Sequence, residues 1–331
     1  MKSPPDNAAA KASPATALRG RVGRLRHRAG RLNPALRGML WTMLAGFIFI
    51  QLNTFMRVLA IALDPFQAMF LRYLFGALVM LPLVLRSGLA AYMPNRMGAQ
   101  VPRAFVHAVA LTLWFVAVPF VPVADNTAIG FATPIFVMLG AAAFFHEAMR
   151  LDRWLATLIG FAGVLIVVWP KLSGDGGFHH LLMLACCPLF AVSFLMTKAQ
   201  TRYERTGVIV VWQAILVTMF SIPLAVAHWT APTTMQWLGF LLCGLLGSAG
   251  QLCQTRALAV TDISSTQSIK FLELIWATFM GWLVFADPPS ASTLSGGVVI
   301  AIATFWIARR EARPVRELRA GKPQSGGGEN G

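Results

Sequence analysis

The chain has 331 residues, of which 56% are hydrophobic and only 12% carry a charged side chain. Soluble globular proteins carry about 25% charged residues, so the composition excludes that class and indicates an all-α integral membrane protein. The net charge of +15 would suit nucleic acid, but nine of the 28 Lys and Arg lie in residues 1–37 and six lie after residue 308. Cytoplasmic flanks of membrane helices carry such an excess. We therefore expect contact with anionic lipid and no nucleic-acid partner.

The two ends of the chain are expected to be tails. Residues 1–37 are basic, rich in Ala and Pro, and predicted to be disordered and cytoplasmic. An organelle transit peptide is the alternative, whereas a secretory signal is not indicated, because no short apolar core with a cleavage site is found. Residues 310–331 are basic and Gly-rich, and are predicted to be a second cytoplasmic tail.

Between the tails, apolar segments fill the chain. A membrane helix needs about 20 apolar residues. The sequence predicts about ten transmembrane helices, over residues 38–61, 65–86, 103–121, 125–146, 153–170, 178–198, 207–228, 235–257, 262–286 and 291–309.

The segments form two diverged copies of a unit of about 140 residues. Phe145-His146-Glu147 in the first copy matches Phe285-Ala286-Asp287 in the second, and Pro82-Leu83 matches Pro223-Leu224. The predicted domains are 38–171 and 178–309, with five helices each. Because five is odd, the second copy must enter the membrane from the opposite face, which gives the inverted repeats typical of secondary transporters.

Basic residues in the connections set the orientation. The predicted inside connections hold Arg86, Arg96, Arg103, Arg150, Arg153, Lys198, Arg202 and Arg205, and the outside connections hold only Lys171. We therefore expect a multi-pass protein of the plasma membrane, the bacterial inner membrane, with both termini in the cytoplasm.

Several residues of the first copy resemble one known family. Arg72, Thr133-Pro134, Glu147, Arg153-Trp154 and Gly160-x-x-Gly163 are similar to the EamA repeat of the drug/metabolite transporter superfamily. The resemblance covers about residues 38–309. It implies two inverted five-helix repeats around a central cavity, and members that move amino acids, nucleobases, vitamins, nucleotide derivatives or drugs. The second copy departs from the pattern, because Lys270-Phe271 stands in place of the Thr-Pro pair.

Lys270 and Glu273 are the foremost candidates for substrate binding. Their spacing of three places them on one face of the ninth predicted span, with Gln267 continuing that face. A charge inside the bilayer faces a cavity or a partner. Lys270 would hold an anionic group, and Glu273 a cationic group or a coupling proton. The alternative is a mutual ion pair that only fixes helix packing.

Polar and aromatic residues of other spans are further binding candidates. Gln51 and Asn53 make the first span polar, and Gln251 lies on a polar stripe of the eighth. Amides suit a polar heterocycle or an amino acid, and interhelical hydrogen bonds are the alternative. Trp114, near mid-span, could stack on a planar ligand or belong to the interface belt. Arg72 could bind an anion or serve a structural or gating role.

Four residues are candidates for gating or structure. Pro134 lies inside the fourth predicted span, where it removes a backbone bond and clashes with the preceding turn. With Thr133 it could form a hinge or a packed kink. Glu147, close to Arg150 and Arg153, could form a salt bridge that gates the inside or simply be solvated.

The pattern predicts a secondary transporter that moves a small polar metabolite, such as an amino-acid derivative, a nucleoside or vitamin, or an organic anion, by alternating access. A passive channel is the alternative, although no ring of like charges is found. An intramembrane enzyme has less support. His146-Glu147 begins like the metalloprotease motif HExxH, but position 150 holds Arg where the motif requires His. No phosphate loop or metal-ligand spacing is present, so neither cofactor nor metal is expected. A homodimer is the alternative to a monomer.

Overall fold

The computed structural model describes residues 34–130, 132–145, 151–172, 177–261, 273–286 and 294–299, together with 270, 291–292, 302 and 306. This part of the chain is helical and contains no strand. Its elements are α2 (Pro34–Ala62), α3 (Pro65–Ser87), the 3-10 helix η1 (Leu89–Tyr92), α4 (Met97–Ala117), α5 (Val123–Gly130), α6 (Thr133–Phe145), α7 (Leu151–Leu172), α8 (Gly177–Gln200), α9 (Thr206–Ala227), α10 (Thr234–Val260) and α12 (Glu273–Phe285).

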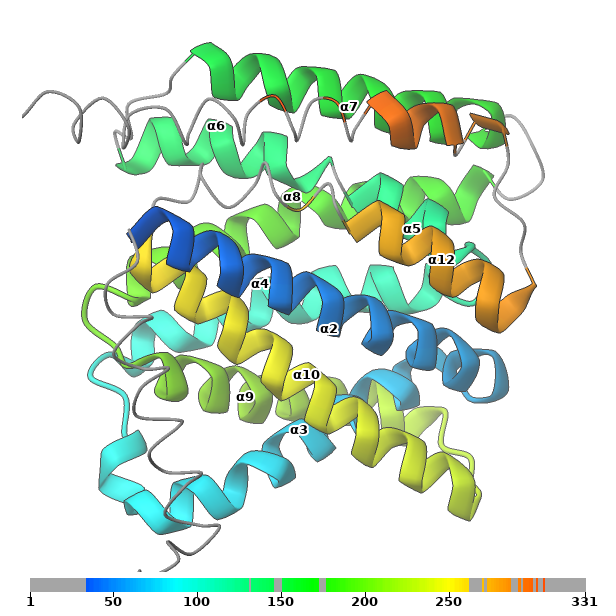
Figure 1. Cartoon of the computed structure of the whole chain (residues 1–331). Coiled ribbons are helices and arrows are strands. Elements are labelled where there is room, and N and C mark those ends of the chain that lie inside the picture. Colours follow the sequence, from blue (N-terminus) through cyan, green and yellow to red (C-terminus); the bar gives the residue numbers. More distant parts are fainter. Residues whose placement is uncertain are drawn as a thin grey trace, which may run out of the picture.

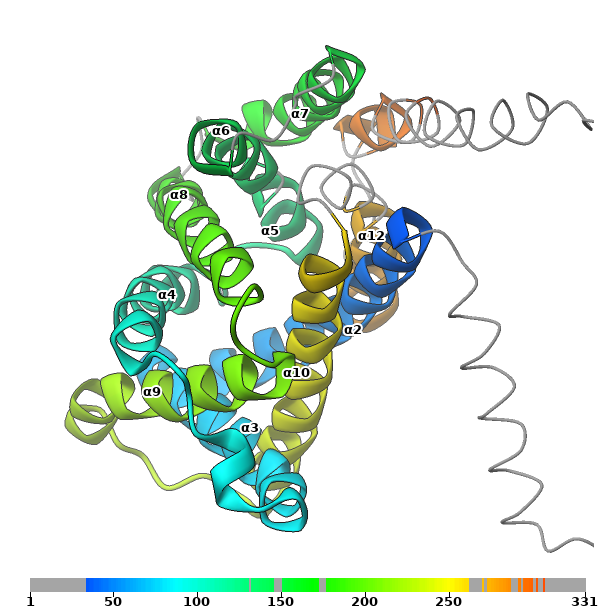
Figure 2. The same cartoon turned by 90° about the vertical axis from the view of Figure 1, so that its left-hand side faces the viewer.

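Six of the described helices are long and apolar enough to cross a membrane, namely α2, α3, α4, α8, α9 and α10. The helices run roughly side by side in Figure 1, and Figure 2 looks along them. Local signals set several ends. Asp64 accepts a hydrogen bond from the backbone N–H of Phe66 at 2.9 Å, and Thr233 forms a capping box with Gln236 at the start of α10. The all-α membrane fold is confirmed.

The fourth predicted span differs from the expectation of one continuous helix. It consists of α5 and α6, which are separated between Gly130 and Thr133. Pro134 is therefore the second residue of α6 and not an interior residue. A helix tolerates proline in its first turn, where its missing N–H has no intrahelical partner. The predicted ninth and tenth spans lie partly outside the described residues.

Each repeat packs its helices into the other repeat. α2 packs extensively along α10, and α4 packs in the same way along α8. α3 and α9 pack against each other. The helices α2, α3 and α4 hold the same places in the first repeat as α8, α9 and α10 in the second. Exchange of the repeats therefore turns the α2–α10 contact into the α8–α4 contact and leaves the α3–α9 contact in place. This exchange is what inverted repeats produce.

The molecule has two faces at the helix ends, which Figure 1 shows on its left and right. The first face is where α2 begins and α6, α8 and α10 end. The second face is where α2 and α12 end and α3, α8 and α10 begin. By the orientation predicted above, the first face is cytoplasmic.

A loop clamps the repeats together at each face. At the second face the side chain of Gln67 in α3 donates to the carbonyl of Thr230 (2.6 Å) and accepts from its backbone N–H (3.0 Å). At the first face the Glu204 carboxylate accepts from the backbone N–H of Arg96 at 3.1 Å, and Trp212 donates to the carbonyl of Tyr92 at 2.8 Å. The connection between the second and third helices of each repeat is thus tied to the other repeat.

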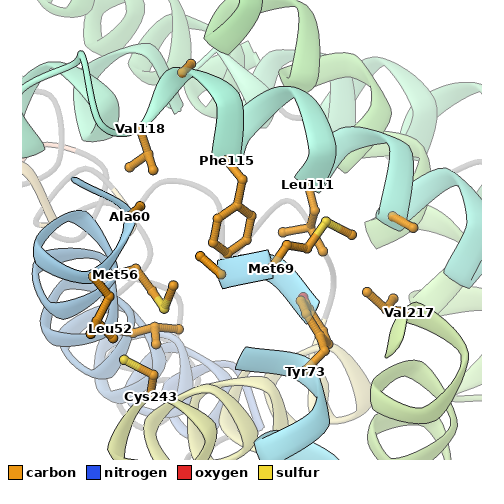
Figure 3. Packing of buried hydrophobic residues seen from close by; sticks show 14 of the residues in the cluster. Leu52, Met56, Ala60, Met69, Tyr73, Leu111, Phe115, Val118, Val217 and Cys243 are labelled. Carbon is orange, nitrogen blue, oxygen red and sulfur yellow. The ribbon is translucent and has the colours of Figure 1, made fainter. Parts of the chain in front are cut away.

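The main apolar core lies between α2, α3 and α4 and extends to α8, α9 and α10. Figure 3 shows Met56 of α2, Met69 of α3 and Phe115 of α4 close together within it. All three side chains are at most 2% exposed. Lipid tails are as apolar as these side chains, so close van der Waals packing stabilises this centre, and it holds the helices that surround the cavity.

Candidate functional site

A central cavity of about 210 Å³ lies between the two repeats. Every element from α2 to α12 contributes to its wall except η1, α7 and α9. Its polar lining residues are Asn53, Arg72, Tyr73, His107, Trp114, Asn126, Thr127, Thr133, Cys186, Cys187, Gln251, Lys270 and Glu273, and its other lining residues are mainly Phe, Leu and Met. The cavity therefore combines charges, amides and aromatic rings, which is the composition of a site for a small polar ligand.

Two cations line this cavity. The guanidinium of Arg72 lies 3.9 Å from the ring centre of Tyr73 and close against Gly247 of α10. A Cβ added to Gly247 would lie 2.6 Å from Nη2 of Arg72, so a larger residue there would displace the guanidinium. The ammonium of Lys270 lies 4.5 Å from the ring centre of Phe194. Both rings stabilise the neighbouring cation.

Glu273 is the only carboxylate among the described residues that line the cavity. It begins α12, three positions after Lys270, and its side chain packs on Gly46 of α2. A Cβ added to Gly46 would lie 2.5 Å from Oε1 of Glu273. The close approach of α2 and α12 thus fixes the carboxylate at the boundary between the two repeats.

Aromatic and amide side chains form a further wall. The indole N–H of Trp114 donates to Oδ1 of Asn126 at 2.9 Å, and the ring of Trp114 meets that of Phe115 edge-on at 4.9 Å between centres. Asn53 and Gln251 line the cavity from α2 and α10. Such rings offer flat faces for a planar ligand, and the amides can both donate and accept hydrogen bonds.

The break between α5 and α6 also faces the cavity, through Gly130, Thr133 and Pro134. The thiol of Cys187, on α8, donates to the carbonyl of Ile129 at 3.5 Å. Irregular backbone at membrane depth is tolerated where it lines a cavity. The break therefore belongs to the cavity wall.

Arg103 was predicted to lie in an inside connection, and this prediction is wrong. It lies within α4 and its side chain is fully buried. The guanidinium donates to Oε1 of Gln100 and to the carbonyl of Ile209, both at 2.9 Å, and to Oε1 of Gln213. Thr197 is a fourth acceptor at 3.5 Å. Neutral acceptors from α4, α8 and α9 thus hold this cation.

His107, one turn beyond Arg103 on α4, was missed by the sequence analysis. Its Nε2 is hydrogen-bonded to the hydroxyl of Tyr73 at 3.0 Å, and its Nδ1 to the hydroxyl of Ser193 at 3.1 Å. The i,i+4 spacing of two polar residues in an apolar helix was the available signal. Because His107 lines the cavity, the buried Arg103 cluster lies one helical turn away from the cavity wall.

The structure brings Lys270, Glu273, Gln251, Trp114, Asn53, Arg72, Pro134 and Thr133 together around the cavity. Gln51 is half-buried on α2 and does not line it. Gln267 and Glu147 lie outside the described residues, and only the backbone of Arg153 is described, in α7.

Trp276 and Asp125 do not line the cavity. Trp276 is exposed and packs edge-on against Phe47 at 5.4 Å between ring centres. Asp125 is the third residue of α5, and its Oδ2 lies 3.8 Å from Nε2 of His180.

Residues 36–169 and 177–309 each match the EamA-like transporter family. The chain belongs to this family. The predicted resemblance is therefore confirmed, and because the family consists of transporters, the intramembrane-enzyme alternative is excluded. The match in two consecutive segments agrees with the exchange of contacts between the repeats.

Relatives with described functions are similar over most of their length. A riboflavin transporter of Rhizobium johnstonii is 33% identical over 286 residues, which cover 86% of this chain and 94% of that protein. An S-adenosylmethionine uptake transporter of Rickettsia prowazekii is 26% identical over 283 residues, which cover 85% and 96%. A pseudopaline exporter of Pseudomonas aeruginosa is 26% identical over 276 residues, which cover 82% and 96%.

A solved crystal structure shares the fold at a TM-score of 0.67 and 16% identity, over 82% of this chain and 98% of that one. Together with the family match, the relatives indicate that this chain is a small-metabolite transporter and a multi-pass protein of the bacterial inner membrane.

Proposed function

We propose that this chain is a secondary transporter that carries a small polar metabolite with a planar heterocycle across the inner membrane by alternating access. The single observation that carries the proposal is the cavity between the repeats, in which Arg72, Lys270 and Glu273 lie among aromatic rings and amides. Inverted repeats with a site at their interface offer two equivalent conformations, one open to each side.

The substrate class is inferred from the lining and from the relatives. Riboflavin and S-adenosylmethionine, named for two relatives, both combine a planar heterocycle with a polar chain. In this cavity Trp114 and the Phe side chains would stack on the ring, while Asn53, Asn126 and Gln251 would hydrogen-bond to its edge. Arg72 and Lys270 would favour a negative group on the polar chain, and Glu273 would take a positive group or a coupling proton.

A thermal-shift screen of the purified protein in detergent tests this proposal, with flavins, nucleosides, S-adenosylmethionine, amino acids and organic anions as ligands. A ligand present at a free concentration of 100 times its Kd raises the stability of the folded protein by about 2.7 kcal/mol. We expect one heterocyclic class to raise the melting temperature, and the rise to vanish in Lys270→Ala and persist in Arg256→Ala, since Arg256 is exposed on α10. A rise that survives Lys270→Ala would place the site elsewhere.

The channel alternative is separated by uptake into proteoliposomes. A transporter saturates with substrate concentration and shows counterflow, whereas a channel does neither.

We further propose that the tails 1–37 and 310–331 are cytoplasmic and contact anionic lipid, and that a homodimer is compatible with this fold. Vesicles with and without anionic lipid, and a mass measurement in detergent, test these two points.

A further inference from the structure

Two small apolar clusters flank the cavity, one toward each face. The cluster toward the second face consists of Ile50 in α2, Val123 in α5 and Ala277 in α12, with Met280 and Phe285 packed against it. The other cluster joins α6, α8 and α10 toward the first face, and its members are Val137, Ala141, Ala191, Leu195 and Leu258, with Phe145 and Phe194 packed against it. Both clusters are separate from the main core.

Each cluster ends in a phenylalanine that lies under an arginine of the other repeat. The guanidinium of Arg57 lies 4.2 Å from the ring centre of Phe285, and that of Arg202 lies 5.1 Å from the ring centre of Phe145. Both distances are within the roughly 6 Å over which a ring attracts a cation. Each arginine–phenylalanine pair thus joins the two repeats.

The two phenylalanines are equivalent under exchange of the repeats, and the two arginines lie near the ends of equivalent helices. Phe145 and Phe285 are the last residues of α6 and α12, and they match in the alignment of the two copies. Arg57 lies near the end of α2, and Arg202 lies just beyond the end of α8, the first helix of the second repeat. Figure 1 places the ends of α6 and α8 at the first face and those of α2 and α12 at the second.

We propose that the pairs Arg57–Phe285 and Arg202–Phe145 are the two gates of the cavity, and that each opens in turn. This inference rests on the proposed function. The clamp at Gln67 ties α3 to the connection between α9 and α10 at the second face, and the clamp at Glu204 ties the start of α4 to the connection between α8 and α9 at the first face. The ends of α6 and α12 lie outside these clamps, and each contacts the other repeat through its cluster. Opening one pair exposes the cavity to one face only, while the other pair keeps it closed.

Accessibility of the cavity from each side tests the gates. Cys186 and Cys187 line the cavity, whereas Cys243 and Cys253 do not. A small membrane-impermeant methanethiosulfonate is added to oriented vesicles from one side or the other. We expect Phe285→Ala and Arg57→Gln to raise labelling from the second face relative to the first, and Phe145→Ala and Arg202→Gln to do the reverse. Loss of a cation–π contact predicts a change of about two- to fivefold in this ratio.

Two controls make the outcome decisive. Arg256→Gln removes another arginine that joins the repeats over an aromatic ring, 5.2 Å from the centre of Trp41, and it should leave the ratio unchanged. Cys186→Ala/Cys187→Ala measures the background. A labelling ratio in all four gate variants that equals that of the unaltered protein, or a shift of both pairs toward the same face, would overturn the gates. Because labelling needs no substrate, this failure is distinct from an absence of uptake by the unaltered protein, which would overturn the proposed function.

Discussion

The hydroxyl of Tyr73 and Nε2 of His107 are hydrogen-bonded at 3.0 Å across the contact between α3 and α4. Both side chains are at most 4% exposed, and both line the cavity. On its other side His107 meets Ser193 of α8. The wall of the cavity is therefore held by a series of hydrogen bonds between side chains of three helices. Replacement of Tyr73 by Phe would interrupt this series.

Tyr73→Phe is expected to lower the free energy of unfolding by about 1–3 kcal/mol, because Nε2 of His107 loses its partner in a buried site. Thermal unfolding in detergent measures the change. Thr218→Val is the matched control, since that hydroxyl bonds only to the carbonyl of Ala214 in its own helix, at 2.7 Å. Equal stability of Tyr73→Phe and the unaltered protein would show that the hydrogen bond contributes nothing.

Arg103→Lys is expected to destabilise the protein by about 1.5–3 kcal/mol, the range for hydrogen bonds to charged groups. The planar guanidinium reaches Gln100, Ile209 and Gln213 at once, and a compact ammonium cannot span these acceptors. Chemical unfolding of both forms measures the loss. Arg256→Lys, at an exposed position, should change stability by less than about 0.5 kcal/mol, and a similar effect of both substitutions would refute the explanation.

Gly247→Ala is expected to displace the Arg72 guanidinium and to cost about 1 kcal/mol, the low end of the range for overpacking, because the guanidinium ends a flexible side chain. Ligand affinity should fall together with stability, because Arg72 lines the cavity. Gly98→Ala is the control, since a Cβ there meets nothing within 4 Å. Titration of the ligand found in the thermal-shift screen, on both variants, provides the measurement. Unchanged affinity in Gly247→Ala would remove Arg72 from the binding site.

Glu273→Gln is expected to abolish the dependence of transport on pH while leaving membrane insertion intact. The amide keeps the shape of the side chain against Gly46 but cannot exchange a proton. Uptake at several pH values, with the amount of inserted protein measured in parallel, checks the prediction. Gly46→Ala, which displaces the carboxylate, should lower uptake without flattening the pH profile. Normal uptake by Glu273→Gln across the pH range would exclude it as the coupling group.

The sequence by itself determined the membrane class, the repeat and the family. Low charge and long apolar segments force the chain into a bilayer whatever its tertiary contacts are, and an odd number of helices in each repeat requires inversion. The candidates Lys270, Glu273 and Arg72 were found because a charge inside a membrane segment is costly. These properties follow from the order of residues along the chain and need no knowledge of which helices touch.

Only the tertiary structure decided which polar residues meet. Arg103 was counted as a loop charge because its acceptors in α8 and α9 are about 90–110 positions away in the chain. Gln51 and Asn53 are two positions apart, yet only Asn53 lines the cavity, because a helix turns by about 100° per residue. The pairing of Arg57 with Phe285 likewise depends on the packing of α2 against α12. Neighbouring helices decide these contacts, and a linear pattern does not contain them.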